Sequence, residues 1–334
     1  MSGEPKRRFS NPASAILTAL RDIRNTDGLI HPSPDHERLD GKTCLITGAN
    51  SGLGFAIAVA LARRGATLIL ACRSGISETA ARITAETGHT RIRMEAVDLL
   101  DLTSVDALCA RLAERGETVD RLILNAGLMA PKSVPSAQGF ESMLAVHYLA
   151  NFRLIERCIS HKIIQVGANG KTGIPRIIAI SSESHRSAPP IDWSDFGKRH
   201  PHGPRGAMAQ YGHSKLALSL MIEGLARKYR ATDGTPLIGL FHMCPGPVNT
   251  NIARGAPALL RPIISTIMGT FFPAPLKAAL PAVYLTASTG LEGRSGDYMH
   301  LMRFKDPSDA VRDKKAADQI LAFGEAVFAK SSDW

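Results

Sequence analysis

Tyr211 and Lys215 lie four residues apart in Tyr211-Gly-His-Ser-Lys215, and a helical run of apolar residues follows them. Positions i and i+4 share one face of a helix, so the lysine can support the phenol. Tyrosine is a poor base near neutrality because its unperturbed pKa is about 10, and a nearby ammonium lowers that pKa. The pair predicts proton exchange with an alcohol or ketone, although the same spacing also occurs by chance in many helices.

A glycine-rich turn, Thr47-Gly-Ala-Asn-Ser-Gly-Leu-Gly54, lies upstream of this pair. The run 42–47 before it is apolar and rich in β-formers, and the run 55–62 after it is typical of a buried helix. Glycines let a backbone approach a pyrophosphate, whose charge faces the open N–H groups of a helix N-terminus. The pattern predicts a dinucleotide site. The alternative is a turn that only lets strand and helix pack closely.

A second buried strand is predicted at 67–72, and Arg73-Ser74 follow it without an acidic residue. An acid at this place would bind the adenosine ribose of NAD, whereas an arginine suits the 2′-phosphate of NADP. We therefore favour NADP(H) over NAD(H), the alternative being a solvated arginine at a strand end. A third strand is predicted at 176–180, ending in Ser181-Ser182, where a hydroxyl can meet a substrate oxygen or simply cap a turn.

In this order, the residues resemble the short-chain dehydrogenase/reductase family from about Leu39 to the C-terminal helix. Asp98-Leu99 match the position that meets the adenine, and Asn125-Ala-Gly127 match the segment that closes the fourth strand. Pro245-Gly246, with Val248 and Thr250, match the segment that touches the nicotinamide amide. The cofactor-binding residues implied by the resemblance are Gly48, Asn50, Ser51, Gly52, Leu53, Gly54, Arg73, Asp98, Leu99, Asn125, Ala126, Gly127, Tyr211, Lys215, Pro245, Gly246, Val248 and Thr250.

A narrower resemblance is to the branch of retinol dehydrogenases and WW-domain oxidoreductases. It is carried by Ala71-Cys-Arg73, Ser181-Ser-x-x-His185, Ile191-Asp-Trp-Ser-Asp195, Ser295-Gly-x-Tyr298 and the tail that begins Asp306-Pro-Ser-Asp. That branch mostly uses NADP(H) on lipophilic alcohols and carbonyls such as retinoids and steroids. The resemblance implies Tyr211 as acid/base, Ser182 as the group that orients the substrate, and Lys215 as a holder of the nicotinamide ribose.

His147 stands where the family has a catalytic asparagine that anchors a water relay to the lysine, and Asn151 lies one helical turn later. An imidazole donates and accepts hydrogen bonds and titrates near neutrality, so it could replace the amide. We expect His147→Asn to retain turnover but to alter its pH profile. The alternative is a helix histidine without a catalytic part.

The predicted fold is α/β. With 44% hydrophobic content, the 334 residues can bury one large core, and at least six strand-like runs alternate with helical ones. We expect a single Rossmann-type, doubly wound parallel sheet of about seven strands with helices on both faces. The expected divisions are an N-terminal extension at 1–38, the dehydrogenase domain at 39–302 and a C-terminal tail helix at 303–334.

Charge and cysteines exclude several functions. The net charge is +10, but the basic residues are scattered among acids, and no basic stripe interleaved with aromatics predicts nucleic-acid binding. Five cysteines without CxxC spacing indicate reduced buried thiols and a cytoplasmic location, with no metal site. No apolar run is long enough to span a bilayer.

The extension places Ile16, Leu17, Leu20 and Ile23 on one helical face, after the basic run Lys6-Arg-Arg8. This face fits peripheral attachment to a membrane, or packing on the parent domain or a dimer partner. By resemblance, residues from about 251 to 275 form an apolar lid, whose composition implies a lipophilic small-molecule substrate. The alternative is an ordinary core helix or a dimer contact. Many family members form dimers or tetramers through the helix carrying Tyr-x-x-x-Lys and its neighbour, which implies a homo-oligomer here.

These observations predict an NADP(H)-dependent oxidoreductase that interconverts a lipophilic alcohol and its ketone or aldehyde. Two alternatives stay open. The first is reduction of an activated C=C bond, because the branch also resembles light-dependent protochlorophyllide reductases. The second is a non-enzymatic NADP(H)-binding sensor or scaffold, since a fold alone does not assign a function.

Overall fold

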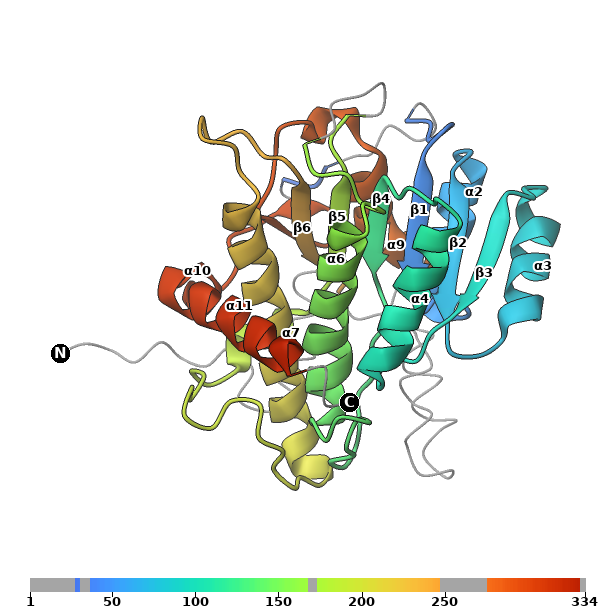
Figure 1. The fold of residues 1–334 in the computed structure, drawn as a ribbon. Helices are drawn as coiled ribbons and strands as arrows, with labels where there is room; N and C mark the ends of the chain where they lie inside the picture. The colour runs from blue at the N-terminus through green and yellow to red at the C-terminus, as the bar shows by residue number, and fades with distance from the viewer. Residues whose placement is uncertain (1–27, 31–36, 168–172, 247–274, 331–334) are drawn as a thin grey trace.

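The chain folds around one mostly parallel sheet. The computed structural model describes residues 28–30, 37–167, 173–246 and 275–330. Within them, eight strands pair in the order β3-β2-β1-β4-β5-β6-β7-β8, and Figure 1 shows the helices on both sides of this sheet. The predicted α/β architecture is confirmed. The addition is β8, a two-residue strand antiparallel to β7, which is too short for a sequence pattern to reveal.

The first half of the chain alternates strands with helices. The apolar residues of β1 and β2 are buried almost throughout, as expected for central parallel strands covered on both faces. In chain order the elements are β1 (Thr43–Thr47), α2 (Gly52–Arg63), β2 (Thr67–Cys72), α3 (Ile76–Thr87), β3 (Ile92–Ala96), α4 (Leu102–Glu114), β4 (Arg121–Leu124), α5 (Ser142–Leu144), the π-helix η1 (Ala145–Leu149) and α6 (Ala150–Ser160).

The second half completes the sheet and adds a C-terminal helix. Its longest element, α7, starts with a proline at the first helical position, where the missing N–H costs no hydrogen bond. In chain order the elements are β5 (Arg176–Ile180), the short 3₁₀-helix η2 (Glu183–Ser187), α7 (Pro204–Lys228), β6 (Gly239–Cys244), α9 (Pro275–Ala287), the 3₁₀-helix η4 (Thr289–Leu291), β7 (Asp297–His300), β8 (Arg303–Phe304), α10 (Asp309–Arg312) and α11 (Lys314–Ala329).

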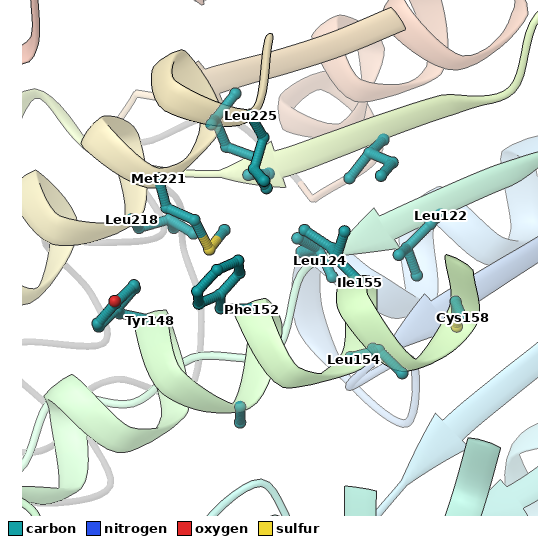
Figure 2. Close-up of a cluster of buried hydrophobic side chains, with 14 of the residues drawn as sticks. Leu122, Leu124, Tyr148, Phe152, Leu154, Ile155, Cys158, Leu218, Met221 and Leu225 are labelled. Carbon is teal, nitrogen blue, oxygen red and sulfur yellow. The ribbon is translucent and has the colours of Figure 1, made fainter. Parts of the chain in front are cut away.

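Two hydrophobic core regions fill the spaces on either side of the sheet. One lies beneath α2 and α9, which pack on each other, and the other lies beneath α4, α6 and α7. Figure 2 shows part of the second region, where Phe152 of α6 lies beside Met221 of α7 and near Leu124 of β4. All five cysteines are buried free thiols, as predicted.

The strand order reverses between β1 and β4, because the chain runs from β1 outward through β3 and then returns to the other side of β1. Open parallel sheets bind ligands in the crevice outside the carboxyl ends of the strands at such a reversal. The residues that follow β1, β2, β4 and β5 all emerge at this edge. They are the residues that the sequence singled out for chemistry.

Candidate active site

The turn between β1 and α2 has the backbone that a phosphate site requires. Gly48 and Gly52 both have positive φ angles, of 69° and 56°, which favour glycine. A Cβ on Gly54 would lie 2.3 Å from the backbone oxygen of Gly48. Ser51 precedes α2 without a side-chain capping hydrogen bond, and the first turn of α2 holds no acidic residue. Therefore the first N–H groups of α2 can meet an anion.

The Asn125 side chain connects the end of β4 to this turn by hydrogen bonds. Its Nδ2 atom donates to the backbone oxygens of Thr47 at 2.9 Å and Gly48 at 3.0 Å. In return, the Thr47 hydroxyl accepts hydrogen bonds from the N–H groups of Asn125 and Ala126. The Asn-Ala-Gly segment thus shapes the glycine turn through its side chain, with Gly127 beside His147 Nε2 and Lys215 Nζ.

Arg73 follows β2 and is exposed, close in sequence to Ser74, whose backbone oxygen accepts a hydrogen bond from Asn50. Asp98 follows β3, and its carboxylate accepts a hydrogen bond from the N–H of Leu100 at 3.0 Å. The predicted cofactor residues of β1, β2 and β3 therefore lie along one edge of the sheet. Three features fit a dinucleotide that carries phosphates: the glycine turn, the uncapped N-terminus of α2 and the exposed Arg73.

Tyr211 and Lys215 lie on α7, one helical turn apart. The Lys215 ammonium is 5.7 Å from the centre of the Tyr211 ring and donates to the backbone oxygen of Ile180 at 2.8 Å. Ile180 is the last residue of β5, so this hydrogen bond ties the lysine to the carboxyl edge of the sheet. Gly212 allows the contact between α7 and η2, because a Cβ there would lie 3.0 Å from the backbone oxygen of Ser184.

The two serines after β5 have different surroundings. Ser181 is buried, and its hydroxyl is 2.7 Å from the hydroxyl of Ser219 on α7. Ser182 is half-buried, and its hydroxyl lies close enough to the Tyr211 side chain to act toward a lower pKa of the tyrosine. The geometry therefore brings Ser182, rather than Ser181, together with Tyr211, in line with the role that the resemblance implies.

Burial governs the ionisation of the two side chains on α7. It raises the pKa of Tyr211 to about 12, with a smaller contribution from Cys244, and the nearby Ser182 hydroxyl only partly opposes this. Burial also lowers the pKa of Lys215 from 10.5 to about 7. The phenol is therefore protonated at neutral pH and can act as an acid toward a substrate oxygen.

His147 lies in η1, a π-helical turn between α5 and α6, and it is fully buried. Its Nε2 atom accepts from the Leu128 N–H at 3.1 Å, and its Nδ1 atom lies 2.8 Å from the Ser214 hydroxyl. Burial, and then the charge of Lys215, hold the pKa of this histidine well below 6.5. The expectation that His147 titrates near neutrality is therefore wrong, because the ring is buried away from solvent and lies beside the positive charge of Lys215.

The side-chain amide of Asn151 is directed to the backbone of its own helix rather than to the site. Its Nδ2 atom donates to the backbone oxygen of His147 at 2.9 Å. Pro245 and Gly246 follow β6 at the same edge as the other site residues. Val248, Thr250, the expected lid up to residue 274 and the amphipathic face at 16–23 lie outside the described residues.

Sequence reasoning missed two groups of this site. Ser214 connects His147 to α7, because its hydroxyl also donates to the backbone oxygen of Tyr211 at 2.8 Å. Its place inside Tyr-x-x-x-Lys was visible, but its partner is 67 residues away in sequence. The second group surrounds Glu183 and His185, directly after Ser182, and its only sequence signal was the motif that contains them.

Known proteins are similar to this chain in sequence and in fold. A model of the short chain dehydrogenase family matches residues 42–191. Retinol dehydrogenase 14 of Mus musculus is 31% identical over 95% of this chain and 89% of its own length. The chain belongs to the short-chain dehydrogenase/reductase family. As a short-chain dehydrogenase/reductase, it is an oxidoreductase that acts on CH–OH or C=O groups with a nicotinamide cofactor.

Other relatives of this short-chain dehydrogenase/reductase lie in the predicted branch. The WW domain-containing oxidoreductase of Drosophila melanogaster is 30% identical over 87% of this chain and 69% of its own length. Polyprenol dehydrogenase of Mus musculus is 30% identical over 93% of this chain and 90% of its own length. The retinol dehydrogenase-like branch is thereby confirmed.

Solved structures share the fold. An uncharacterised protein of Mycobacterium paratuberculosis superposes with a TM-score of 0.64, at 25% identity, over 87% of this chain and 95% of that one. A short chain dehydrogenase of Escherichia coli CFT073 complexed with NADPH superposes with a TM-score of 0.58, at 22% identity, over 79% of this chain and 98% of that one. Among the described residues, no helix has both the length and the apolar character needed to cross a bilayer.

Proposed function

We propose that this short-chain dehydrogenase/reductase uses NADP(H) to interconvert a lipophilic alcohol and its ketone or aldehyde, with Tyr211 as the acid/base. The observation that carries the proposal is the convergence of three side chains at one edge of the sheet. Ser182 contacts the Tyr211 phenol, and Lys215 lies 5.7 Å from its ring. All three stand beyond the carboxyl end of β5, where a parallel sheet binds its ligand.

Each side chain has a distinct task at the substrate oxygen. When bound, the nicotinamide supplies or accepts the hydride. Tyr211 is protonated at neutral pH, so in the reductive direction it donates its proton to the developing alkoxide. Ser182 donates a hydrogen bond to the same oxygen, and Lys215 holds the cofactor ribose and supports the phenolate that remains. In the oxidative direction the phenolate takes the alcohol proton back.

The preference for NADP(H) rests on Arg73. This exposed guanidinium follows β2, and no acidic residue stands there to bind a ribose 2′-hydroxyl. An arginine binds a phosphate with several charge-assisted hydrogen bonds. A structural neighbour of the same fold is an NADPH complex, which agrees with this preference.

Two observations support the proposal that the substrate is lipophilic. The segment 251–275 is apolar in sequence, and a lid of this composition favours an apolar ligand. The relatives are named for retinol and polyprenol, which are both long hydrocarbon alcohols. We therefore place the substrate among long-chain or polycyclic alcohols and their carbonyl forms.

The test is NADPH oxidation, with NADH in parallel, against all-trans-retinaldehyde, decanal, a steroid ketone and a cyclic enone. We expect turnover with at least one carbonyl, its loss in Tyr211→Phe, and no loss in the matched variant Tyr284→Phe, which removes a phenol hydroxyl from α9. Binding of NADPH should be nearly unchanged in Tyr211→Phe. Substantial residual turnover in Tyr211→Phe would refute the assignment.

The same assay separates the alternatives. Product analysis by mass and proton spectra distinguishes an alcohol from a saturated ketone, and a saturated ketone would replace the proposal by C=C reduction. Tight NADPH binding without turnover on any carbonyl, and without an effect of Tyr211→Phe on any property, would instead indicate a sensor. In that case His147→Asn shows whether restoring the usual amide restores activity.

A further inference from the structure

Ser182 is held by the first turn of η2. Its hydroxyl accepts a hydrogen bond from the Ser184 N–H at 3.2 Å. Its backbone oxygen accepts two hydrogen bonds from His185, one from the N–H at 3.2 Å and one from the Nδ1 atom of the ring at 2.6 Å. The hydroxyl and the backbone oxygen of Ser182 are therefore both held by residues of η2.

The second ring nitrogen of His185 faces a distant part of the chain. Its Nε2 atom accepts a hydrogen bond from the Ser308 N–H at 3.2 Å, across 123 residues of sequence. A backbone N–H can only donate and a backbone oxygen can only accept, so Nδ1 carries the proton and Nε2 carries none. Ser308 therefore selects the tautomer that donates to Ser182.

The charged groups around His185 leave the ring neutral. Burial lowers its pKa to about 4; the hydrogen bond to Ser182 and the carboxylate of Glu183 act in the opposite direction, while Arg186 and Lys305 add to the lowering. The edge of the ring also packs against the Tyr298 ring, with centroids 5.3 Å apart. The imidazole is a buried hydrogen-bond relay and stays uncharged throughout the physiological range.

Glu183 provides a second connection between η2 and the same distant segment. Its carboxylate accepts hydrogen bonds from the Tyr298 hydroxyl at 2.8 Å and from Lys305 Nζ at 2.7 Å. Burial acts to raise the pKa of Glu183, but His300, Lys305 and Arg186 outweigh it and lower the value to about 2. The carboxylate is therefore charged, and it orders η2 against β7 and the residues after β8.

These partners bring together three motifs that the reaction chemistry left unexplained. Ser-Ser-x-x-His contributes Ser182 and His185, Ser-Gly-x-Tyr contributes Tyr298, and Asp-Pro-Ser contributes Ser308. Tyr298 and Ser308 follow the first motif by more than 110 residues in sequence, yet all three motifs meet beside the serine that approaches Tyr211. Packing alone does not require this set, because apolar side chains would fill the same volume without buried polar atoms that need partners.

We propose that His185 is a positioning residue for Ser182, and that the Ser308 N–H sets the tautomer through which it acts. The inference rests on the proposed function of Ser182. In this arrangement the C-terminal segment 298–308 orients the peptide that carries the Ser182 hydroxyl, and so directs that hydroxyl toward the substrate oxygen beside Tyr211.

Ser308→Pro is the decisive variant, because it replaces the N–H group that donates to His185 Nε2 by the proline Cδ, which removes the donor and displaces the ring from its position. Ser308 has φ of −67° and ψ of 156°, a backbone that proline adopts without strain. Its hydroxyl is buried and has no hydrogen-bond partner within the described residues, so Ser308→Ala is a matched control that keeps the N–H. With all-trans-retinaldehyde and NADPH, we expect kcat to fall about 10-fold or more in Ser308→Pro. Ser308→Ala should keep the wild-type kcat, and the KM for NADPH should not change in either variant.

A double-mutant cycle shows whether the effect passes through the serine. In a Ser182→Ala background, Ser308→Pro should cause no further loss of kcat, because the group being positioned is already absent. A full additional loss in that background would overturn the proposal. His185→Asn places an amide donor near Nδ1 and should retain more kcat than His185→Gln, whereas the opposite order would also overturn it.

A second readout needs no turnover. The ¹⁵N shifts of the wild-type His185 ring should show a neutral Nδ1–H tautomer between about pH 5 and pH 8, and in Ser308→Pro the ring should begin to titrate in that interval. An Nε2–H tautomer in the wild type would overturn the inference whether or not the enzyme is active. Failure of every carbonyl substrate, with the expected ring tautomer intact, would count against the proposed function instead.

Discussion

His147 donates from Nδ1 to the hydroxyl of Ser214 at 2.8 Å, and both side chains are fully buried. The direction of this hydrogen bond follows from the other nitrogen, which accepts from the Leu128 N–H and therefore carries no proton. The Ser214 hydroxyl in turn donates a hydrogen bond to the backbone oxygen of Tyr211. His147 thus links the loop after β4 to the helix that carries Tyr211 through one neutral tautomer.

The first prediction concerns His147→Asn. An asparagine amide places a donor near the position of Nδ1 and can donate toward Ser214, so we expect turnover to be retained. Because the pKa of His147 lies well below 6.5, its charge does not change in the working range, and the pH profile of kcat/KM should stay the same above about pH 6. His147→Ala leaves a buried N–H unpaired and should lower the free energy of unfolding by about 2 kcal/mol. An altered pH profile in His147→Asn would show that the ring titrates after all.

The second prediction concerns Arg73→Ala. Loss of charge-assisted hydrogen bonds to a 2′-phosphate costs about 1.5–3 kcal/mol, so the KM for NADPH should rise roughly 10- to 100-fold. The KM for NADH should change little, because NADH has no phosphate there. Lys330→Ala removes an exposed positive charge from the end of α11 and serves as the control for general electrostatic attraction. Equal losses with both cofactors would refute a 2′-phosphate contact.

The third prediction concerns the stability cost of Lys215. Its folded pKa of about 7 lies below the ordinary 10.5, so between these values the unfolded chain binds more protons than the folded one. The free energy of unfolding of the cofactor-free protein should therefore rise with pH across that interval. Lys215→Met should remove this slope and should stabilise the protein at pH 7 by on the order of 1 kcal/mol, while abolishing turnover. Chemical denaturation at several pH values measures both effects, and a destabilised Lys215→Met would contradict them.

The sequence predicted the parts of this molecule that depend on short-range patterns. The sequence predicted the strand at 67–72 and the glycine turn from Thr47 to Gly54, because β-forming residues and glycines determine the backbone conformation of the residues next to them. The helical spacing of Tyr211 and Lys215 placed both on α7. Family resemblance supplied what pattern alone left open, including the choice of Ser182 over Ser181.

The parts that stayed hidden depend on contacts between distant segments. The partner of Glu183 at Lys305 is 122 residues away, and no local rule connects them. The neutral state of His147 follows from its complete burial beside Lys215, which a sequence does not display. The placement of α11 was also hidden in the sequence. An amphipathic pattern predicts that one face of a helix is covered, but it does not say which element covers it.

The covering of α7 by α11 bears on the expected oligomer. Figure 1 shows α11 lying across α7, and the Tyr148 hydroxyl near the start of α6 donates to the backbone oxygen of Ile320. A Cβ on Gly324 would lie 2.1 Å from the Phe152 ring, so this glycine permits the close approach of α11 to α6. The resemblance implied an oligomer formed, as in many family members, through the helix of Tyr-x-x-x-Lys and its neighbour. In this chain, part of that surface is already occupied by α11.

The last prediction is that the full chain does not associate through α7 and α6. Sedimentation should therefore give a mass near the 35.8 kDa of one chain. Gly324→Leu should displace α11, expose apolar surface and promote self-association, whereas Ala326→Leu, on an exposed position of the same helix, should not. Hydrogen exchange gives an independent measure, because a dimer formed through α7 would have to release α11, and its amides would then exchange rapidly. A wild-type dimer with rapidly exchanging α11 amides would contradict this prediction.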